Sequence, residues 1–254
     1  MNWIRKNLYL AAIPISMVLS TASMVSVEAN SAGIFLGKQK APILISQPFN
    51  PKRDVGKPES TTGGASRGGN SNCTQKGGDL VSLLPKDKLG LTLNERPTFY
   101  WHMSKSDVKT AEFLLLDDNE DVVYEKNLTL PQKPGIFAFT LPPEAPGLKV
   151  DKQYHWFLEL NCASGADETV AVEGWVERTR PSLAVRMKLN RAEPKHHSKV
   201  YAGAGIWHEA INNVAQQRCA NPNDSATTLY WNQLLTSVGL KEVISESLNN
   251  VCSN

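Results

Sequence analysis

The sequence predicts an α+β protein, mostly β, in which an antiparallel immunoglobulin-like β-sandwich is followed by a C-terminal helical hairpin. Two observations support this prediction. Between residues 97 and 178, apolar side chains alternate with polar ones in short segments separated by Pro, Gly and acidic turns. Such alternation is typical of strands with one buried face. After Pro181 the apolar residues recur at intervals of three and four instead, which indicates amphipathic helices.

The first 72 residues are predicted to precede the folded part. A basic start and an apolar run are followed by small residues at Val27 and Ala29, where a signal peptidase would cleave. We therefore interpret residues 1–29 as a signal peptide. Residues 30–72 include a long tract of Gly, Ser, Thr and Pro and predict a disordered linker. We expect an exported protein, periplasmic or extracellular, with no membrane span after cleavage.

Charge and cysteine content narrow the function classes. The chain has 27 basic and 25 acidic side chains, and the linker holds more basic than acidic ones, so the body from residue 73 onward is slightly acidic. Such a body argues against nucleic acid as the main ligand. Four cysteines in an exported chain favour two disulfides. Of the three possible pairings we choose Cys73–Cys162 and Cys219–Cys252, because each pair then lies within one predicted region.

The β-sandwich domain is predicted over residues 73–180. Its strands are expected at residues 79–84, 97–103, 111–116, 122–128, 136–141, 153–162 and 169–177, with a turn over 88–91 and an acidic hairpin turn over 117–121. The alternation places one face of each strand in the core, and the predicted core residues include Phe99, Trp101, Met103, Tyr154, Trp156, Leu158 and Leu160.

The helical region is predicted over residues 181–254. We expect a short helix around 183–189, a long amphipathic helix over 201–215, and a third helix over 225–238 that Asn223, Asp224 or Ser225 caps and Gly239 ends. A last short helix is expected over 241–248, before Cys252.

The succession of segments resembles a known family. GLTLNERPTFYWHM, AEFLLLDDNEDVVYEK, YHWFLELNC, VEGWVER and YAGAGIWHEA follow one another in the order found in the domain-of-unknown-function 928 family of exported cyanobacterial proteins. The resemblance covers about residues 73–250. It implies an exported protein with a cysteine pair in the β part, and it implies no activity and no catalytic residues.

Four short patterns suggest chemistry, and each lacks a required part. Residues 64–68 match G-x-S-x-G but have no strand or helix signal beside them. His208-Glu209 begins an H-E-x-x-H zinc motif whose last position is Asn212. Residues 117–121 alternate like the start of a calcium loop without its glycine, and His196-His197 lies in a polar stretch. We therefore predict no catalytic residue, metal or cofactor.

Three residues are candidate contacts for a partner or ligand. Trp175 alternates with glutamates on the polar face of its strand, and Tyr100 and His102 share the polar face of theirs. We expect a non-catalytic exported module that binds another envelope protein or organises a surface assembly. The alternatives are an envelope hydrolase with a site built from distant residues, and a carbohydrate-binding module that needs Trp175 and Tyr100 exposed. The pattern does not predict an oligomeric state.

Overall fold

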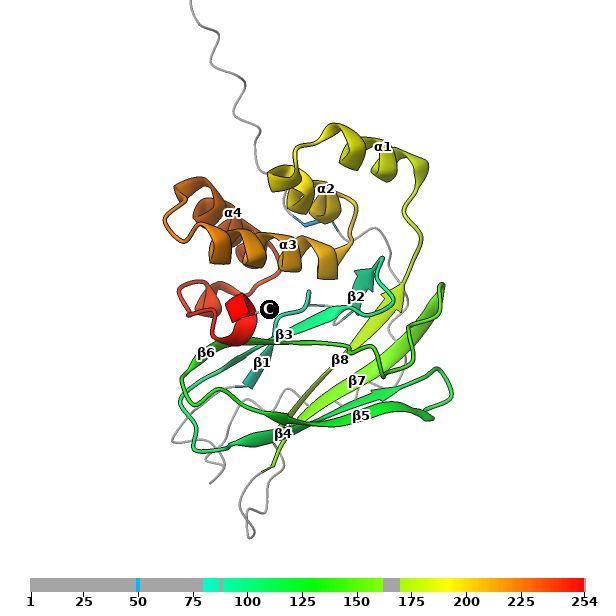
Figure 1. Cartoon of the computed structure of the whole chain (residues 1–254), viewed down its shortest axis with the longest axis vertical. Coiled ribbons are helices and arrows are strands. Elements are labelled where there is room, and N and C mark those ends of the chain that lie inside the picture. The colour runs from blue at the N-terminus through cyan, green and yellow to red at the C-terminus, as the bar shows by residue number, and fades with distance from the viewer. Residues whose placement is uncertain (1–48, 51–79, 87–88, 162–169, 254) are drawn as a thin grey trace, which may run out of the picture. The chain divides into compact units, whose positions relative to one another are not determined.

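A computed structural model of the chain describes residues 49–50, 80–86, 89–161 and 170–253 (Figure 1). In this part the protein has a mixed α/β fold with two sheets, eight strands and four α-helices. The predicted signal peptide, most of the predicted linker, the G-x-S-x-G match and the predicted Cys73–Cys162 bond lie outside the described residues. Within the described ranges, none of the helices combines the length and the apolar character that a membrane crossing needs.

The larger sheet has five strands in the order β2-β8-β7-β4-β5. These are β2 (Leu89–Thr92), β8 (Ala171–Arg178), β7 (Lys152–Leu160), β4 (Thr110–Leu116) and β5 (Val122–Thr129). The β2–β8 pair is parallel, whereas the pairs formed by β4 with β5, β4 with β7 and β7 with β8 are antiparallel. The prediction of an antiparallel arrangement is therefore wrong for β2. The predicted turn over 88–91 is also wrong, because three of its four residues, Leu89, Gly90 and Leu91, belong to this strand and pair with β8.

The smaller sheet has three strands in the order β1-β3-β6, namely β1 (Leu80–Ser82), β3 (Thr98–Met103) and β6 (Gly135–Thr140). Aromatic side chains join the two sheets in one core. The Trp101 ring of β3 lies 5.6 Å from the Trp156 ring of β7 and 6.0 Å from the Phe113 ring of β4, measured between centroids. All three side chains are almost completely buried. The predicted core of these strands is confirmed, since period-two alternation reports directly on the buried face.

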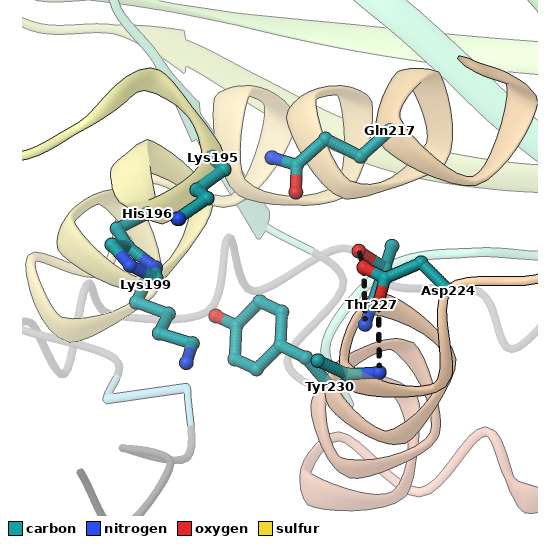
Figure 2. Close-up of a pocket in the computed structure, with 8 residues that line it drawn as sticks. Lys195, His196, Lys199, Gln217, Asp224, Thr227 and Tyr230 are labelled. Carbon is teal, nitrogen blue, oxygen red and sulfur yellow. Dashed lines mark hydrogen bonds between the residues drawn. The ribbon is translucent and has the colours of Figure 1, made fainter. Parts of the chain in front are cut away.

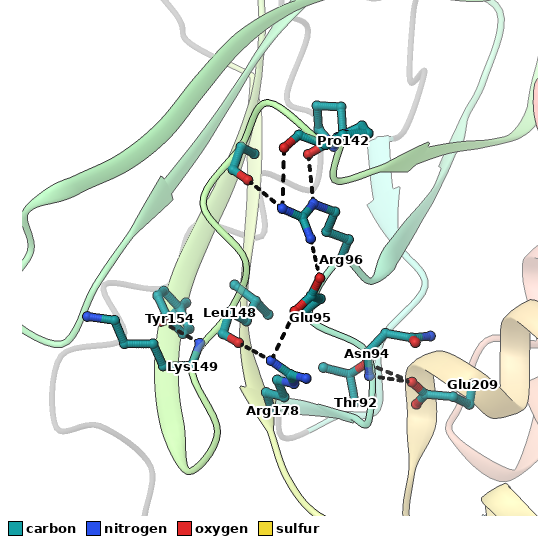
Figure 3. A network of polar contacts seen from close by, with 12 residues as sticks. Thr92, Asn94, Glu95, Arg96, Pro142, Leu148, Lys149, Tyr154, Arg178 and Glu209 are labelled. Atoms are coloured by element: carbon teal, nitrogen blue, oxygen red, sulfur yellow. Dashed lines mark hydrogen bonds and ion pairs between the residues drawn. The ribbon is translucent and has the colours of Figure 1, made fainter.

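A polar network lies where the β2–β3 turn meets the ends of β7 and β8 (Figure 3). The Glu95 carboxylate contacts both Arg96 and Arg178, the latter at 3.6 Å. Arg178 also donates to the Leu148 carbonyl at 2.7 Å, and the Lys149 amide donates to the Tyr154 hydroxyl at 3.0 Å. The bonds to Leu148 and Lys149 satisfy two backbone groups that strand pairing leaves open, as partly buried backbone requires.

The helical region contains α1 (Leu183–Arg191), α2 (His197–Gly203), α3 (Trp207–Ala220) and α4 (Ser225–Ser237), with 3₁₀ turns at Pro194–His196, Lys241–Val243 and Asn250–Ser253. Figure 1 shows the helices gathered on the side of the sheets where β2 and β3 lie. α3 contacts both of these strands as well as α2 and α4. It is therefore one of the elements that join the helices to the sheets, together with the C-terminal segment along β6.

Two of the helix predictions need correction. The amphipathic segment over 201–215 is two helices, because Gly205 adopts a φ of 72° and ends the first helix before Trp207 begins the second. The segment over 241–248 contains a 3₁₀ turn at Lys241–Val243 in place of a helix. The predicted stop at Gly239 is confirmed by its φ of 86°, and Asp224 is the residue that caps α4.

The disulfide Cys219–Cys252 is present, with 5.2 Å between the two Cα atoms, as the sequence pairing predicted. It ties the end of α3 to the last 3₁₀ turn. The chain just before that turn runs along β6, where the Ile136 amide donates to the Ser247 carbonyl at 2.7 Å and the Asn249 amide donates to the Ile136 carbonyl at 2.8 Å. The bond therefore holds the C-terminal segment against the smaller sheet.

Phe49 and Asn50, which fall inside the predicted linker, contact the helices. The Phe49 ring meets the Trp207 indole edge-on at 5.1 Å between centroids, and its amide donates to the Ser237 hydroxyl at 3.3 Å. The Asn50 amide donates to the Ala202 carbonyl at 3.2 Å. The composition of the surrounding stretch gave no signal for this contact, because a single aromatic residue does not change the character of a long polar tract.

Candidate functional site

Trp207, His208 and Glu209 form the junction between α3 and the sheets. All three begin α3 and are buried, which is unusual for a histidine and a glutamate. The Trp207 indole donates its Nε1 proton to the Leu83 carbonyl at 2.8 Å. A helix start that points three consecutive side chains into protein needs partners on several sides, and here β2, β3 and the segment after β1 supply them.

Glu209 fastens the turn between β2 and β3 to the helix (Figure 3). Its Oε1 accepts hydrogen bonds from the Thr92 hydroxyl at 2.8 Å, the Leu93 amide at 2.8 Å and the Asn94 amide at 3.1 Å. Burial raises the pKa of this carboxyl, and the three hydrogen bonds oppose that rise by stabilising the carboxylate. Glu209 is therefore a structural clamp that acts through Oε1, while its Oε2 is buried without a hydrogen-bond partner among the described residues.

His208 lies beside Glu209 and contacts two strands. Its Nδ1 is 2.9 Å from the Thr98 carbonyl, and because a carbonyl accepts, Nδ1 carries the proton. Burial lowers the pKa of the imidazole to about 4, so the ring is neutral at neutral pH. Its Nε2 is packed so closely against β2 that a Cβ placed on Gly90 would lie 2.4 Å away. This nitrogen is fully buried and has no hydrogen-bond partner among the described residues.

The structure accounts for the incomplete zinc motif. The position of the second histidine is held by Asn212, whose Oδ1 accepts a hydrogen bond from the Tyr100 hydroxyl at 2.6 Å. Over residues 80–86, 89–161 and 170–253, no three His, Cys, Asp or Glu side chains are grouped so that they could hold a metal ion. The residues of this motif join the helices to the sheets, and they do so by hydrogen bonds.

Tyr100 and His102 are buried, so the prediction that they face water is wrong. Tyr100 is 4% exposed, and burial raises the pKa of its hydroxyl above the usual range. His102 is 8% exposed, and its Nε2 lies 3.5 Å from a carboxylate oxygen of Glu246. The alternation identified the face of β3 correctly, but α3 and the C-terminal segment cover that face. A pattern in one strand carries no information about elements more than 100 residues away.

Trp175 lies on the face of β8 opposite the core and is partly buried. Its ring stacks on the His155 ring at 4.2 Å between centroids with an interplanar angle of 9°. His155 Nε2 is also 3.2 Å from a carboxylate oxygen of Glu173, which is buried on the same face. Trp175 therefore keeps part of its surface available for contact, although its environment is more enclosed than the sequence pattern suggested.

Three glutamates meet on the same outer face of the larger sheet. Glu112 of β4 pairs directly with Glu159 of β7, and the β5 residue Glu125 is close enough to share a hydrogen bond with it. That hydrogen bond is the largest cause of a raised Glu112 pKa, followed by burial and by the charges of Glu125 and Glu159. Like charges across neighbouring strands destabilise a sheet.

Replacing Glu112 with glutamine is therefore expected to stabilise the protein at neutral pH. A carboxyl with a raised pKa in the folded state contributes stability below its unfolded value of 4.5 and loses that contribution as the pH rises through the higher folded value. We expect a gain of about 0.5 kcal/mol or less at pH 7, because the group is partly exposed, and no gain near pH 4. Urea unfolding at both pH values measures it. The exposed Glu242→Gln is the control, and a gain that persists at pH 4 would contradict the charge explanation.

The remaining sequence patterns are local structure. The Asp117 carboxylate accepts from the amides of Asn119 at 2.8 Å and Asp121 at 3.1 Å, which closes the predicted hairpin turn between β4 and β5. His197 Nε2 lies 3.1 Å from the Leu189 carbonyl and 3.2 Å from the Ala192 carbonyl, so it fastens the end of α1 to the start of α2.

A basic surface that the sequence patterns did not predict extends along α1 and into α2. Residues 179–208 contain six Lys and Arg side chains and a single acidic one, Glu193. In α1 the apolar Leu183 and Met187 are 65% and 44% exposed, while Val185 is the buried residue of the helix. The net charge of the body does not reveal this surface, because acidic residues in the β4–β5 turn and on the outer face of the larger sheet offset its positive charge. Charge counted in windows would have found it.

A pocket opens where α2, α3 and α4 meet, with a volume of about 330 Å³ (Figure 2). Lys195, His196 and Lys199 line one side, Gln217 another, and Asp224, Ala226, Thr227 and Tyr230 the third. The Asp224 carboxylate is occupied at the start of α4, where it accepts from the Thr227 amide at 3.1 Å and from the Thr227 hydroxyl at 2.5 Å. These bonds lower the pKa of Asp224, so it stays charged.

Comparison with known proteins identifies the family of most of the chain. A family model described as Domain of Unknown Function (DUF928) matches residues 62–248. Among solved structures, the fn3 domain of human collagen alpha-1(XX) chain is similar over 46% of this chain and 93% of that domain, with 9% sequence identity and a TM-score of 0.26. A search of curated proteins found no match.

Proposed function

This chain belongs to the Domain of Unknown Function (DUF928) family, and from its geometry we propose that it is an exported, non-catalytic module that binds an acidic surface of another envelope protein. The observation that carries the proposal is the outward face of α1. Leu183 and Met187 are one turn apart and exposed, and Arg186, Lys188 and Arg191 lie around them. Met and Arg are enriched in protein interfaces, and an apolar ridge flanked by cations complements an acidic surface.

His208 and Glu209 are the residues that most resemble catalytic groups, and their structural role favours a binding function for the protein. His208 and Glu209 are engaged at the junction between helices and sheets, and the 330 Å³ pocket is lined by neither of them. The carbohydrate-binding alternative required Trp175 and Tyr100 on one exposed sheet face, and Tyr100 is buried. Export is supported by the Cys219–Cys252 disulfide, because such bonds persist in oxidising compartments.

The sheet order supports the proposal that the β part is an immunoglobulin-like sandwich. In an immunoglobulin-like sandwich, strands G, F and C share one sheet and strands A, B and E lie in the other. The order β8-β7-β4 and the order β1-β3-β6 correspond to these two sets. α3 and α4, joined by residues 221–224 and in contact with each other, support the predicted helical hairpin. In this proposal the sandwich is a rigid base and the helices carry the binding face.

The test is a cross-linked pull-down of the tagged, full-length secreted chain from envelope fractions of its host, followed by binding measurements with the purified partner. We expect one stoichiometric protein with an acidic surface, and an affinity that falls as salt is raised. Met187→Asp should weaken binding at least about tenfold, because it places a charge in the centre of the contact. The matched control is Val122→Asp, which changes an exposed apolar residue on β5, away from the helices.

Three results would contradict the proposal. If Trp175→Ala abolished binding while Met187→Asp did not, the contact surface would be the outer sheet face. If the chain bound anionic lipid vesicles more strongly than the captured protein, the basic helix would serve a membrane surface. If the captured protein bound Met187→Asp and wild type equally, α1 would not form the contact.

A further inference from the structure

The pocket between α2, α3 and α4 contains a buried hydrogen-bond donor that the protein leaves unused. Tyr230 is 6% exposed, and no described group meets its hydroxyl in hydrogen-bonding geometry, although the Ser198 side chain is close enough to lower its pKa slightly against the effect of burial. The nearby Ser198 hydroxyl donates its own proton to the Ala210 carbonyl at 2.7 Å. Buried polar groups are nearly always bonded in native proteins, so an unused one in the wall of a pocket indicates a ligand atom or water that completes it.

The charges around this hydroxyl are suited to an anion. Lys199 lies over the Tyr230 ring, with its Nζ 5.4 Å from the ring centroid, and Lys195 lines the same side. Figure 2 shows the Tyr230 hydroxyl pointing toward this lysine side of the pocket. Lys195 also forms an exposed ion pair with Glu193 at 2.8 Å, which a ligand can exchange because such pairs contribute little. Burial raises the pKa of Tyr230 to about 12, so the hydroxyl remains a donor.

The opposite side of the pocket presents acceptors. Gln217 donates through Nε2 to Asn213 Oδ1 at 2.6 Å, and Figure 2 shows its carbonyl oxygen facing the pocket. Asp224 uses part of its acceptor capacity on the start of α4, and a carboxylate has lone pairs for further donors. One side therefore suits an oxyanion and the other suits hydroxyl groups. A volume of about 330 Å³ is at the small end of ligand sites and suits a molecule of monosaccharide size.

We propose that this pocket binds a small polyhydroxy acid, such as a sugar that carries a carboxylate or a phosphate. Its anionic group would lie between Lys195, Lys199 and the Tyr230 hydroxyl, and its hydroxyl groups would donate to Gln217 and Asp224. No residue of α1 lines the pocket. The inference therefore does not depend on the proposed protein-binding face, and either can fail while the other holds.

Titration calorimetry of the full secreted chain with D-glucuronate, glucose 6-phosphate and glucose tests the ligand class. We expect the two acids to bind with dissociation constants of about 1 mM or lower, and glucose to bind at least about tenfold more weakly, because a charged hydrogen bond roughly doubles the contribution of a neutral one. Preference for the carboxylate or for the phosphate identifies the source of the anion. If neither acid bound at 10 mM, or glucose bound equally well, the proposal would be overturned.

Two variants test the residues. Tyr230→Phe keeps the ring and removes the unused donor, so the affinity for the better acid should fall about three- to tenfold while thermal stability is unchanged or higher. Lys199→Gln should weaken the same acid by about tenfold, because it removes one of the two lysine charges. Lys241→Gln, outside the pocket, is the control. Equal affinity in wild type and both pocket variants would place any binding elsewhere. A stability loss in Tyr230→Phe without an affinity loss would assign the hydroxyl a structural role and refute the inference.

Discussion

Replacing Glu209 with alanine is expected to lower the free energy of unfolding by about 3–5 kcal/mol. The variant removes the shared acceptor of the Thr92 hydroxyl and the Leu93 and Asn94 amides, and it leaves these donors without that acceptor in a partly buried turn. It also opens space at the junction between α3 and β2. Chemical denaturation followed by far-UV circular dichroism measures the change.

Two further variants separate the clamp from a general effect of removing a glutamate. Glu209→Gln keeps one acceptor oxygen and should cost less than half as much as alanine, because the neutral amide still accepts two or three of the bonds. Glu242→Ala, on an exposed 3₁₀ turn, should change stability by less than about 0.5 kcal/mol. If Glu209→Ala were as mild as Glu242→Ala, the hydrogen bonds at the junction would not hold the helices to the sheets.

Removing the Cys219–Cys252 disulfide, by replacing both cysteines with serine, is expected to cost about 3–4 kcal/mol. The bond closes a loop with a sequence separation of 33, which limits the freedom of the unfolded chain. In the folded protein the same bond keeps the C-terminal segment along β6. Thermal and urea unfolding of the double variant measure the total loss.

Hydrogen exchange of the backbone amides shows which part of the fold loses stability. The Ile136 amide, bonded to Ser247, and the Ala138 amide, bonded to the Asn250 side chain, should exchange faster in the double variant. The Phe113 amide in β4 should change less, because the C-terminal segment runs along β6 and not along β4. Equal acceleration at Ile136 and Phe113 would contradict a local role and indicate that the bond acts through global stability alone.

Several features were predictable from the sequence because each depends on residues close together in the chain. Alternation in β3 and β7 identified Trp101 and Trp156 as core, and the Asp224 cap and the Gly239 stop bounded α4. The parallel β2 strand was missed, since its four residues are too few for a period and its partner β8 lies more than 80 residues later. The break at Gly205 was missed because apolar spacing continues across it.

The candidate sites were also predictable only in part from the sequence. The sequence shows at Asn212 that the zinc motif begun by His208 and Glu209 is incomplete. Only the structure shows that these two residues are buried against Gly90 and the β2–β3 turn. Tyr100 and His102 were placed on the correct strand face and given the wrong environment, because α3 and the C-terminal segment cover it. The pocket joins residues of three helices, with Lys195 and Tyr230 more than 30 positions apart, so no local pattern marks it.

By itself the sequence determined the β-then-α order, the family and the aromatic core, and it favoured the Cys219–Cys252 pairing that the structure contains. Side-chain periodicity, caps and composition act over a few residues and can be read in one dimension. The tertiary structure alone decided which polar residues are buried, how α3 is clamped to β2 and β3, and that three helices enclose a pocket with an unused tyrosine hydroxyl. These features arise from desolvation and from contacts between distant segments, and their energies depend on where the chain folds back on itself.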